Sequence, residues 1–258
     1  VLAYTKQGNR ADMNHSARRK MLKFLGTFMV VLFPVVLAIW FAHIRAMTET
    51  HNQLRSFAQL VLNKTELVIL QADLARDMAQ LYQGKMCTPA HQKSMLNIIR
   101  GRLYISELIY AQGDHFLCST SMTPPVTYIM PTPDYKRTPD IAIYYYRDTP
   151  FFAGYRMTYM QRGNYVAVIN PLSYSEVMSD DPDLSWGVYD TVTDTFFSAS
   201  EAANIAQFAP LIRGEASTFQ QDDRFYTIVH SEKRPIAIIV STSDNRVSQI
   251  FYHEAALT

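Results

Sequence analysis

The stretch "LYISELIYAQGDHFLCST", Leu103–Thr120, marks the point at which the chain changes from a helical to a strand pattern. Two runs rich in β-branched and aromatic residues flank "QGD", and such runs on either side of a turn signal predict a β-hairpin. Gly113 supplies the backbone freedom that the turn requires. The stretch therefore predicts two antiparallel strands, the second of which carries Cys118.

Most of the chain after this hairpin repeats the strand pattern. The predicted strands are "DIAIYYYRD", "GYRMTYM", "YVAVINP", "WGVYD" and "TFFSAS", followed by the hairpin "RFYTIVHSEKRPIAIIVSTS". A short helix or loop is predicted in "SYSEVMS", a short helix in "EAANIAQFAPLI", and a return to helix in the tail "DNRVSQIFYHEAALT". This order predicts one α+β domain with a mostly antiparallel sheet and flanking helices. By fold-level analogy it is similar to PAS-like sensor domains.

Two helices are predicted before the hairpin. "TPAHQKSMLNIIRGR" predicts the second of them, with Thr88 as its cap, Pro89 in its first position and Gly101 at its end. The first covers 47–82, which contains neither Pro nor Gly. Its apolar residues recur at spacings of three and four, with a drift toward heptads: Leu54, Phe57, Val61, Leu67, Leu70, Leu74, Met78 and Leu81. Two interpretations stay open: a stripe packed on its own domain, and the seam of a homodimer.

A long apolar stretch precedes these helices. "FLGTFMVVLFPVVLAIWFA", Phe24–Ala42, contains no charged residue and is long enough to cross a hydrocarbon core of roughly 30 Å. Pro34 would be costly in a soluble core helix but is tolerated in membranes. A cleaved signal peptide has a shorter apolar stretch, and "FAHIRAM" offers no good cleavage site. The stretch therefore predicts an uncleaved transmembrane helix over 24–44.

The charges on either side of the span predict its orientation. The basic residues before it include Arg10, Arg18, Arg19, Lys20 and Lys23, whereas Arg45 alone follows closely. Positive residues mark the cytoplasmic side, so 1–23 is predicted to be a cytoplasmic tail and 45–258 to be exported. In a bacterium this is a single-pass inner-membrane protein with a periplasmic domain, made of the helix 47–82 and an α+β core over 87–258. Met13 opens a more natural start than Val1.

Composition and motifs narrow the function. The net charge of +1 gives no basic surface for a nucleic-acid partner. The sequence lacks G-x-S-x-G, H-E-x-x-H and a Gly-rich phosphate loop, so of the candidate functions an extracytoplasmic enzyme is the least favoured. No catalytic residue and no cofactor are predicted.

The two cysteines, Cys87 and Cys118, leave three interpretations open. The first is a disulfide, because the periplasm is oxidising. The second is a zinc site, because "CTPAH" and "HFLC" add His91 and His115 to a Cys2His2 set. On its own, a histidine in the position of His91 on a helix is expected to be solvated. The third is a pair of free thiols, one of them catalytic.

The tyrosines suggest a different class of function. A small-molecule receptor would use a pocket lined by Tyr144, Tyr146 and Tyr159, with Tyr145 and Tyr165 beside them. Core packing is the commoner use of aromatic residues in a sheet. Both interpretations stay open.

The order of these features resembles the periplasmic CSS-motif domain of bacterial membrane proteins. The resemblance rests on the span, the long helix, Cys87 after a helix stop, "IIRGR", "ELIYAQGDHF" and "CST". The motif's Cys-Ser-Ser corresponds to Cys118, Ser119 and Thr120, and Thr120 departs from the second Ser while keeping a hydroxyl.

The resemblance implies a regulatory role. In that family the domain usually precedes a second span and a cytoplasmic EAL domain that hydrolyses cyclic-di-GMP, and the cysteine pair is associated with control of that enzyme by disulfide state. Periplasmic thiol–disulfide oxidoreductases would be its partners. Ser119 and Thr120 would cap the strand end or tune the neighbouring sulfur, or serve as ordinary turn residues. The EAL domain would follow residue 258, or the chain is a stand-alone relative; "HEAAL" is not its motif.

Overall fold

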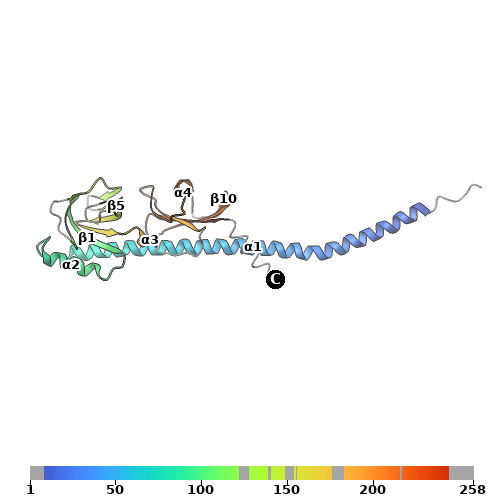
Figure 1. The fold of residues 1–258 in the computed structure, drawn as a ribbon, viewed down its shortest axis with the longest axis horizontal. Coiled ribbons are helices and arrows are strands. Elements are labelled where there is room, and N and C mark those ends of the chain that lie inside the picture. The colour runs from blue at the N-terminus through green and yellow to red at the C-terminus, as the bar shows by residue number, and fades with distance from the viewer. Residues whose placement is uncertain are drawn as a thin grey trace, which may run out of the picture. The chain divides into compact units, whose positions relative to one another are not determined.

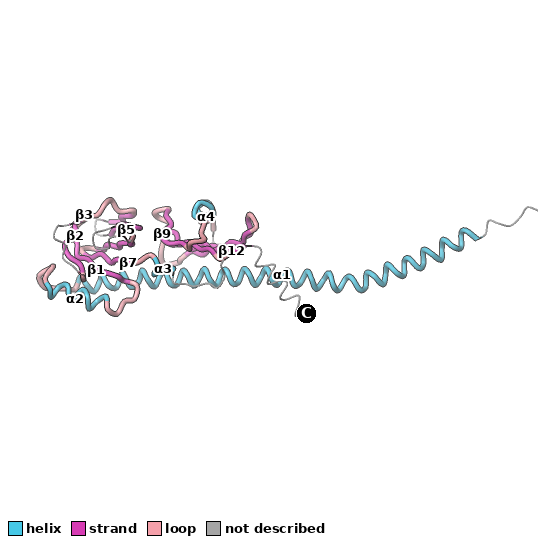
Figure 2. Tube along the Cα trace, viewed as in Figure 1, coloured by secondary structure: helices cyan, strands magenta, loops and turns pink. Residues whose placement is uncertain are grey.

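The computed structural model describes residues 9–121, 128–138, 141–148, 154, 156–175, 183–215 and 217–243. The chain divides into two compact units, 1–50 with 245–258, and 51–244. Figures 1 and 2 show the long helix α1 and the strands of the second unit. The predicted C-terminal helix and the side chain of Tyr146 lie outside the described residues.

Helix α1 runs without interruption from Asn9 to Gln80, with Pro34 inside it. It contains both the predicted span and the predicted long helix, which ends at Gln80 rather than at residue 82. By length and composition it is the one helix among the described residues that could cross a membrane. Within the first unit, the following apolar side chains of α1 are exposed: Met29, Val30, Leu32, Phe33, Val35, Val36, Leu37, Ile39, Trp40, Phe41 and Ile44.

In the second unit, α1 has two apolar faces. The buried face consists of Leu54, Ala58, Val61, Leu62, Thr65, Val68, Ile69, Ala72, Ala75, Arg76 and Ala79. The opposite face carries exposed apolar side chains, which we call the outer stripe: Leu60, Leu67, Leu70, Leu74, Met78 and Leu81. The predicted stripe is therefore divided between the faces, because Leu54 and Val61 are buried whereas its residues from Leu67 onward are exposed.

The first sheet has seven antiparallel strands in the order β3-β2-β1-β7-β6-β5-β4. In that order they are Tyr128–Ile129, His115–Ser119, Ile105–Gln112, Tyr165–Ile169, Met157–Arg162, Ile141–Arg147 and Tyr135–Thr138. β1 and β2 form the predicted hairpin, and Gly113 adopts the left-handed φ of +65° in its turn. Helix α2, Pro89–Ile99, has the predicted cap, since Thr88 accepts a hydrogen bond from the backbone N–H of His91.

The second sheet has five antiparallel strands in the order β10-β11-β12-β8-β9. In that order they are Thr218–Gln221, Arg224–His230, Ile236–Ser243, Ser185–Asp190 and Thr195–Ala199. Helices α3, Leu172–Ser175, and α4, Ile205–Leu211, accompany it. The α+β class, the long helix and the antiparallel pairing are confirmed. A single sheet was wrong, because β8 pairs with β12 instead of extending the first sheet.

Both sheets of the second unit lie along α1 (Figure 1). The seven-stranded sheet is linked to the helix by the ion pair of Arg162 with Asp77, 3.0 Å long. The five-stranded sheet is linked to it by the hydrogen bond from Ser231 Oγ to Glu66 Oε1, 2.6 Å long. Burial of the inner face of α1 against both sheets supplies the apolar contact that holds the unit together.

Candidate functional site

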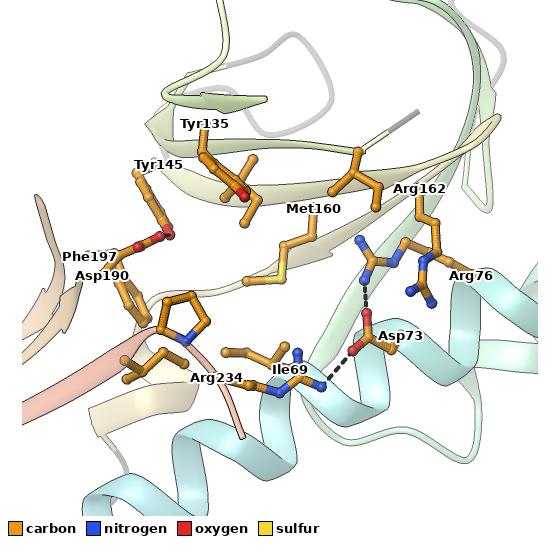
Figure 3. Close-up of a pocket in the computed structure, with 14 residues that line it drawn as sticks. Ile69, Asp73, Arg76, Tyr135, Tyr145, Met160, Arg162, Asp190, Phe197 and Arg234 are labelled. Carbon is orange, nitrogen blue, oxygen red and sulfur yellow. Dashed lines mark hydrogen bonds and ion pairs between the residues drawn. The ribbon is translucent and has the colours of Figure 1, made fainter. Parts of the chain in front are cut away.

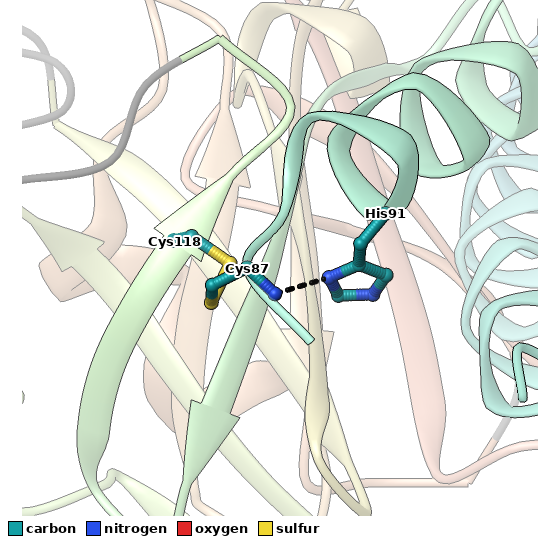
Figure 4. A group of neighbouring side chains, drawn as sticks. All are labelled: Cys87, His91 and Cys118. Carbon is teal, nitrogen blue, oxygen red and sulfur yellow. Dashed lines mark hydrogen bonds between the residues drawn. A yellow bond between two sulfur atoms is a disulfide. The ribbon is translucent and has the colours of Figure 1, made fainter. Parts of the chain in front are cut away.

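A disulfide joins Cys87 to Cys118, with a Cα–Cα distance of 5.6 Å (Figure 4). Cys87 lies between α1 and α2, and Cys118 lies in β2, opposite Tyr110 of β1. The bond therefore ties the segment that follows α1 to the seven-stranded sheet. In the chain-entropy account, closing a loop with a sequence separation of 31 stabilises the fold by about 3–4 kcal/mol.

The backbone of Cys87 adopts an unusual conformation. Its φ is +55°, in the left-handed region that residues with a Cβ rarely occupy. Its N–H donates to His91 Nδ1 over 3.0 Å, and Thr88 begins α2 directly after it. Left-handed backbone outside glycine costs roughly 1–2 kcal/mol, so the disulfide, the hydrogen bond and the start of α2 together hold this position.

His91 is fully buried, so the expectation of a solvated side chain was wrong. Tyr82, Tyr110 and Tyr165 surround its ring, with centroid distances of 4.7, 5.4 and 5.9 Å. Burial lowers the pKa of His91, because the charged imidazolium loses its hydration. The ring is therefore neutral, and Nδ1, which accepts from Cys87, leaves the proton on Nε2.

A hydrogen-bonded chain runs from Cys87 through His91 to the sheet. His91 Nε2 lies 3.0 Å from the hydroxyl of Tyr165 in β7, so the neutral ring donates to that oxygen. The Tyr165 hydroxyl in turn donates to Met86 Sδ over 3.8 Å. Burial, with Tyr110 and Tyr82 nearby, raises the pKa of Tyr165 to about 12, so its proton is retained at neutral pH. These hydrogen bonds hold Met86 and Cys87, which lie just before α2, in place.

The carboxylate of Glu107 organises the segment after Cys118. It accepts hydrogen bonds from the Thr120 hydroxyl, from the Ser121 N–H at 2.7 Å and from the Ser121 hydroxyl at 2.7 Å. Ser119 is buried, and its carbonyl accepts from Gln92 Nε2. Thr120 thus fastens the strand end to β1. Glu107 was not predicted, although a charged residue inside the apolar run "ISELI" is a recognisable signal.

Three of the four predicted zinc ligands lie together. The ligand atoms of Cys87, His91 and Cys118 are within 4.8 Å of one another. His115 lies outside this group, and its Nδ1 is 2.6 Å from Asp114 Oδ1 in an exposed pair. Because the two sulfurs are bonded to each other, the group is a disulfide with an adjacent imidazole.

The described tyrosines of the predicted pocket lie in three different surroundings. Tyr144 and Tyr159 are buried in the apolar core of the seven-stranded sheet, and the Tyr144 hydroxyl donates to Gln161. Tyr165 contacts His91, as described above. Tyr145 lines a cavity beside α1 whose other residues the sequence did not reveal (Figure 3). These residues come from distant segments, so no local pattern could have joined them.

Comparisons with known proteins identify relatives of this chain. A curated relative, "Probable cyclic di-GMP phosphodiesterase PdeB" of Escherichia coli (strain K12), is 28% identical over 160 residues. The match covers 61% of this chain and 30% of that relative, so it spans less than a third of the relative's length.

Solved structures share the fold. The extracellular domain of rpHK1S-Z16, whose name assigns it to the histidine kinases, aligns with a TM-score of 0.56 at 12% identity, over 80% of this chain and 97% of that one. The extracellular domain of vpHK1S-Z8 aligns with a TM-score of 0.51 at 9% identity, over 80% and 98%. The family described as "CSS motif domain associated with EAL" matches residues 50–255. The chain belongs to the family of CSS-motif domains associated with EAL.

Proposed function

We propose that this chain is the periplasmic, redox-responsive input domain of an inner-membrane cyclic-di-GMP phosphodiesterase. The family's association with EAL and the name of the E. coli relative support the phosphodiesterase link. The apolar part of α1 and the basic tail before it support a membrane anchor with the domain in the periplasm. Periplasmic thiol–disulfide oxidoreductases would set the state of the bond.

The observation that carries the proposal is the position of the disulfide. Cys87 follows the end of α1, the same helix that contains the candidate span. Breaking the bond removes the covalent restraint on the segment between α1 and α2, where the left-handed backbone of Cys87 is held against its preference. The end of α1 is then restrained by its remaining contacts, and two arrangements of the helix become accessible.

Pairing of α1 with a second copy would convert this change into a signal. The outer stripe supports a homodimer, because its apolar side chains repeat with spacings close to a heptad and remain exposed in one chain. Leu74 is 46% exposed at its centre. In this proposal, reduction changes how the two outer stripes pack and so alters the position of the spans.

The test uses the full chain in lipid nanodiscs with a photo-crosslinking amino acid at Leu74 and, as a control, at the exposed polar position Gln59. We expect a crosslinked dimer from position 74 whose yield changes at least threefold between the oxidised chain and the Cys87→Ser, Cys118→Ser variant. Equal yields in the two states would refute redox control of pairing. Equal cyclic-di-GMP hydrolysis by the two forms, each joined to an EAL domain, would refute the regulatory role.

A second function is favoured by the cluster of Cys87, His91 and Cys118. In the reduced chain, two thiolates and one imidazole would offer a soft three-ligand site suited to zinc or copper(I). The reduced chain would then bind one equivalent of metal and the oxidised chain none. His91→Ala should weaken binding at least tenfold, whereas His115→Ala should not. Failure of the reduced chain to bind either metal would exclude this function.

A further inference from the structure

A cavity of about 190 Å³ lies between α1 and the two sheets of the second unit (Figure 3). This volume is many times the roughly 10–15 Å³ that a single water molecule needs, so the cavity can hold a small organic molecule. It is lined by Ile69, Asp73, Arg76, Tyr135, Ile141, Ile143, Tyr145, Met160, Arg162, Asp190, Phe197, Arg234, Pro235 and Ile236. Its wall therefore contains residues of α1 and of both sheets.

Arginine side chains dominate the end of the cavity nearest α1. Asp73 accepts hydrogen bonds from Arg76 and, over 2.6 Å, from Arg234 Nη2, as Figure 3 shows. Arg162 pairs with Asp77 at 3.0 Å. Three guanidinium groups are therefore paired with two carboxylates, so one positive charge at this end of the cavity is not balanced by a carboxylate.

Arg76 is the most enclosed of these cations. It is only 5% exposed, and the structure gives partners to Nε, which donates to the Ala72 carbonyl over 3.1 Å, and to Nη2, which donates to Asp73. A guanidinium has five N–H donors, so donors remain for a further acceptor. Burial lowers the pKa of Arg76, an effect that Asp73 opposes and Arg162 adds to. A bound anion would offset the cost of that burial.

The far end of the cavity holds the carboxylate of Asp190. It accepts from the Tyr145 hydroxyl at 2.7 Å and from the backbone N–H groups of Val192 and Thr193 at 2.8 and 3.2 Å. An anion is therefore favoured at the other end, beside the arginines. The amino group of an α-amino acid would lie beside the same guanidinium groups that hold its carboxylate and would be repelled by them. The charge pattern therefore favours an anion without an amino group.

The rest of the wall is apolar and comes from both sheets. Met160 and Ile143 belong to the seven-stranded sheet, and Phe197 and Ile236 belong to the five-stranded sheet. We propose that the cavity binds a short aliphatic monocarboxylate, with its carboxylate on Arg76 and Arg234 and its hydrocarbon tail against Met160 and Ile143. The ligand contacts α1, the seven-stranded sheet and the turn between β11 and β12, so it supplies a second input to this domain that does not depend on the disulfide.

The test is titration of the oxidised full chain in nanodiscs with acetate, propionate, butyrate, pentanoate and hexanoate, followed by calorimetry, with empty nanodiscs as the blank. We expect affinity to rise about fourfold for each methylene until the cavity is full. Norvaline and butylamine should bind at least tenfold more weakly than the acid of equal length. No saturable binding of any acid, or equal binding of norvaline, would overturn the proposal.

Variants locate the site. Arg76→Gln and Arg234→Gln should each weaken binding at least tenfold, and Ile143→Phe should shift the preferred acid to a shorter one by filling the cavity. The matched control is Arg213→Gln, which removes an equal charge from an exposed pair with Asp194. Should Arg76→Gln fail to fold, Arg234→Gln and Ile143→Phe decide the outcome. Binding unchanged in these variants, or weakened equally by Arg213→Gln, would show that the acid binds elsewhere.

Discussion

The side-chain amide of Gln92 donates to the carbonyl of Ser119 over 3.1 Å, so α2 is hydrogen-bonded to β2 one residue beyond Cys118. Helix α2 is thus held to the sheet by the disulfide before it and by two hydrogen bonds within it, those of His91 with Tyr165 and of Gln92 with Ser119. Breaking the disulfide leaves the two hydrogen bonds in place. The response to reduction should therefore begin in the segment before α2.

Hydrogen exchange should resolve this order. In the wild-type chain, reduction should raise amide exchange in 81–88 at least tenfold and in 89–99 by less than threefold, because Gln92 still holds the helix. In Gln92→Ala the increase should extend into α2. Gln83→Ala, an exposed amide outside α2, is the control and should behave as wild type. Equal increases in 81–88 and 89–99 of the wild-type chain would contradict the expectation that α2 stays bound to the sheet after reduction. The measurement is exchange followed by mass spectrometry.

Replacing Glu107 by Gln should destabilise the oxidised chain by about 1–3 kcal/mol. The amide keeps the shape of the carboxylate but loses an ionised acceptor for Thr120 and Ser121, and hydrogen bonds to a charged group are worth more than neutral ones. The midpoint of urea unfolding checks this value. Glu201→Gln changes the same charge at an exposed position and should shift the midpoint little. An equal shift in both variants would assign the effect to net charge.

His91 should make the stability of the oxidised chain depend on pH below about 6.5. Its pKa is lowered in the folded state, so the unfolded chain binds the proton more readily between that pKa and the ordinary value of 6.5. The stabilisation is complete above pH 6.5 and is lost as the pH falls through the lowered pKa. His91→Asn keeps an acceptor for Cys87 without titrating.

Melting temperatures between pH 7.5 and 5 provide the measurement. The difference between wild type and His91→Asn isolates His91 from the other titratable groups. We expect this difference to be constant above pH 6.5 and to move against the wild type below it. A difference that stays constant down to pH 5 would mean that the folded state accepts the charged ring.

Gly187 should tolerate no side chain. A Cβ added there would lie 2.8 Å from Cε1 of Phe196 and 3.3 Å from Cδ2 of Phe208, within the core of the five-stranded sheet. Gly187→Ala should therefore destabilise the chain by about 1–3 kcal/mol through overpacking. Gly101→Ala is the matched control, because no heavy atom of the described residues lies within 4 Å of its Cβ. Unfolding by urea compares the two, and equal midpoints would mean that Phe196 moves aside freely.

The sequence predicted features that depend on local pattern. The cap of α2 by Thr88, the turn at Gly113 and the apolar helix before residue 47 all follow from nearby residues. Strand partners depend on distant segments, so the pairing of β8 with β12 and the separation into two sheets were not visible. Burial of a side chain could not be predicted for the same reason, since His91 is enclosed by Tyr110 of β1, Tyr165 of β7 and Tyr82 from the segment after α1.

The candidate site likewise combines features that the sequence predicted with features that it could not predict. A disulfide was one of the interpretations that the sequence offered, because the chain has only two cysteines and the predicted periplasmic location is oxidising. Glu107 and Gln92 act through contacts across the hairpin and across to α2, and those contacts appear only when the strands are in register. The cavity beside Arg76 needs both sheets in place, so no part of its lining stands out along the chain.

Each sheet is built from one continuous stretch of the chain. The strands of the first sheet lie within 105–169 and those of the second within 185–243. Except for β1 with β7 and β8 with β12, the paired strands follow one another in sequence, and such local pairings favour rapid assembly. If the part after the span is exported in sequence order, the end of α1 emerges first, then all of the first sheet, then the second. Both cysteines precede residue 185, so an oxidant can close their bond while the five-stranded sheet is still unmade.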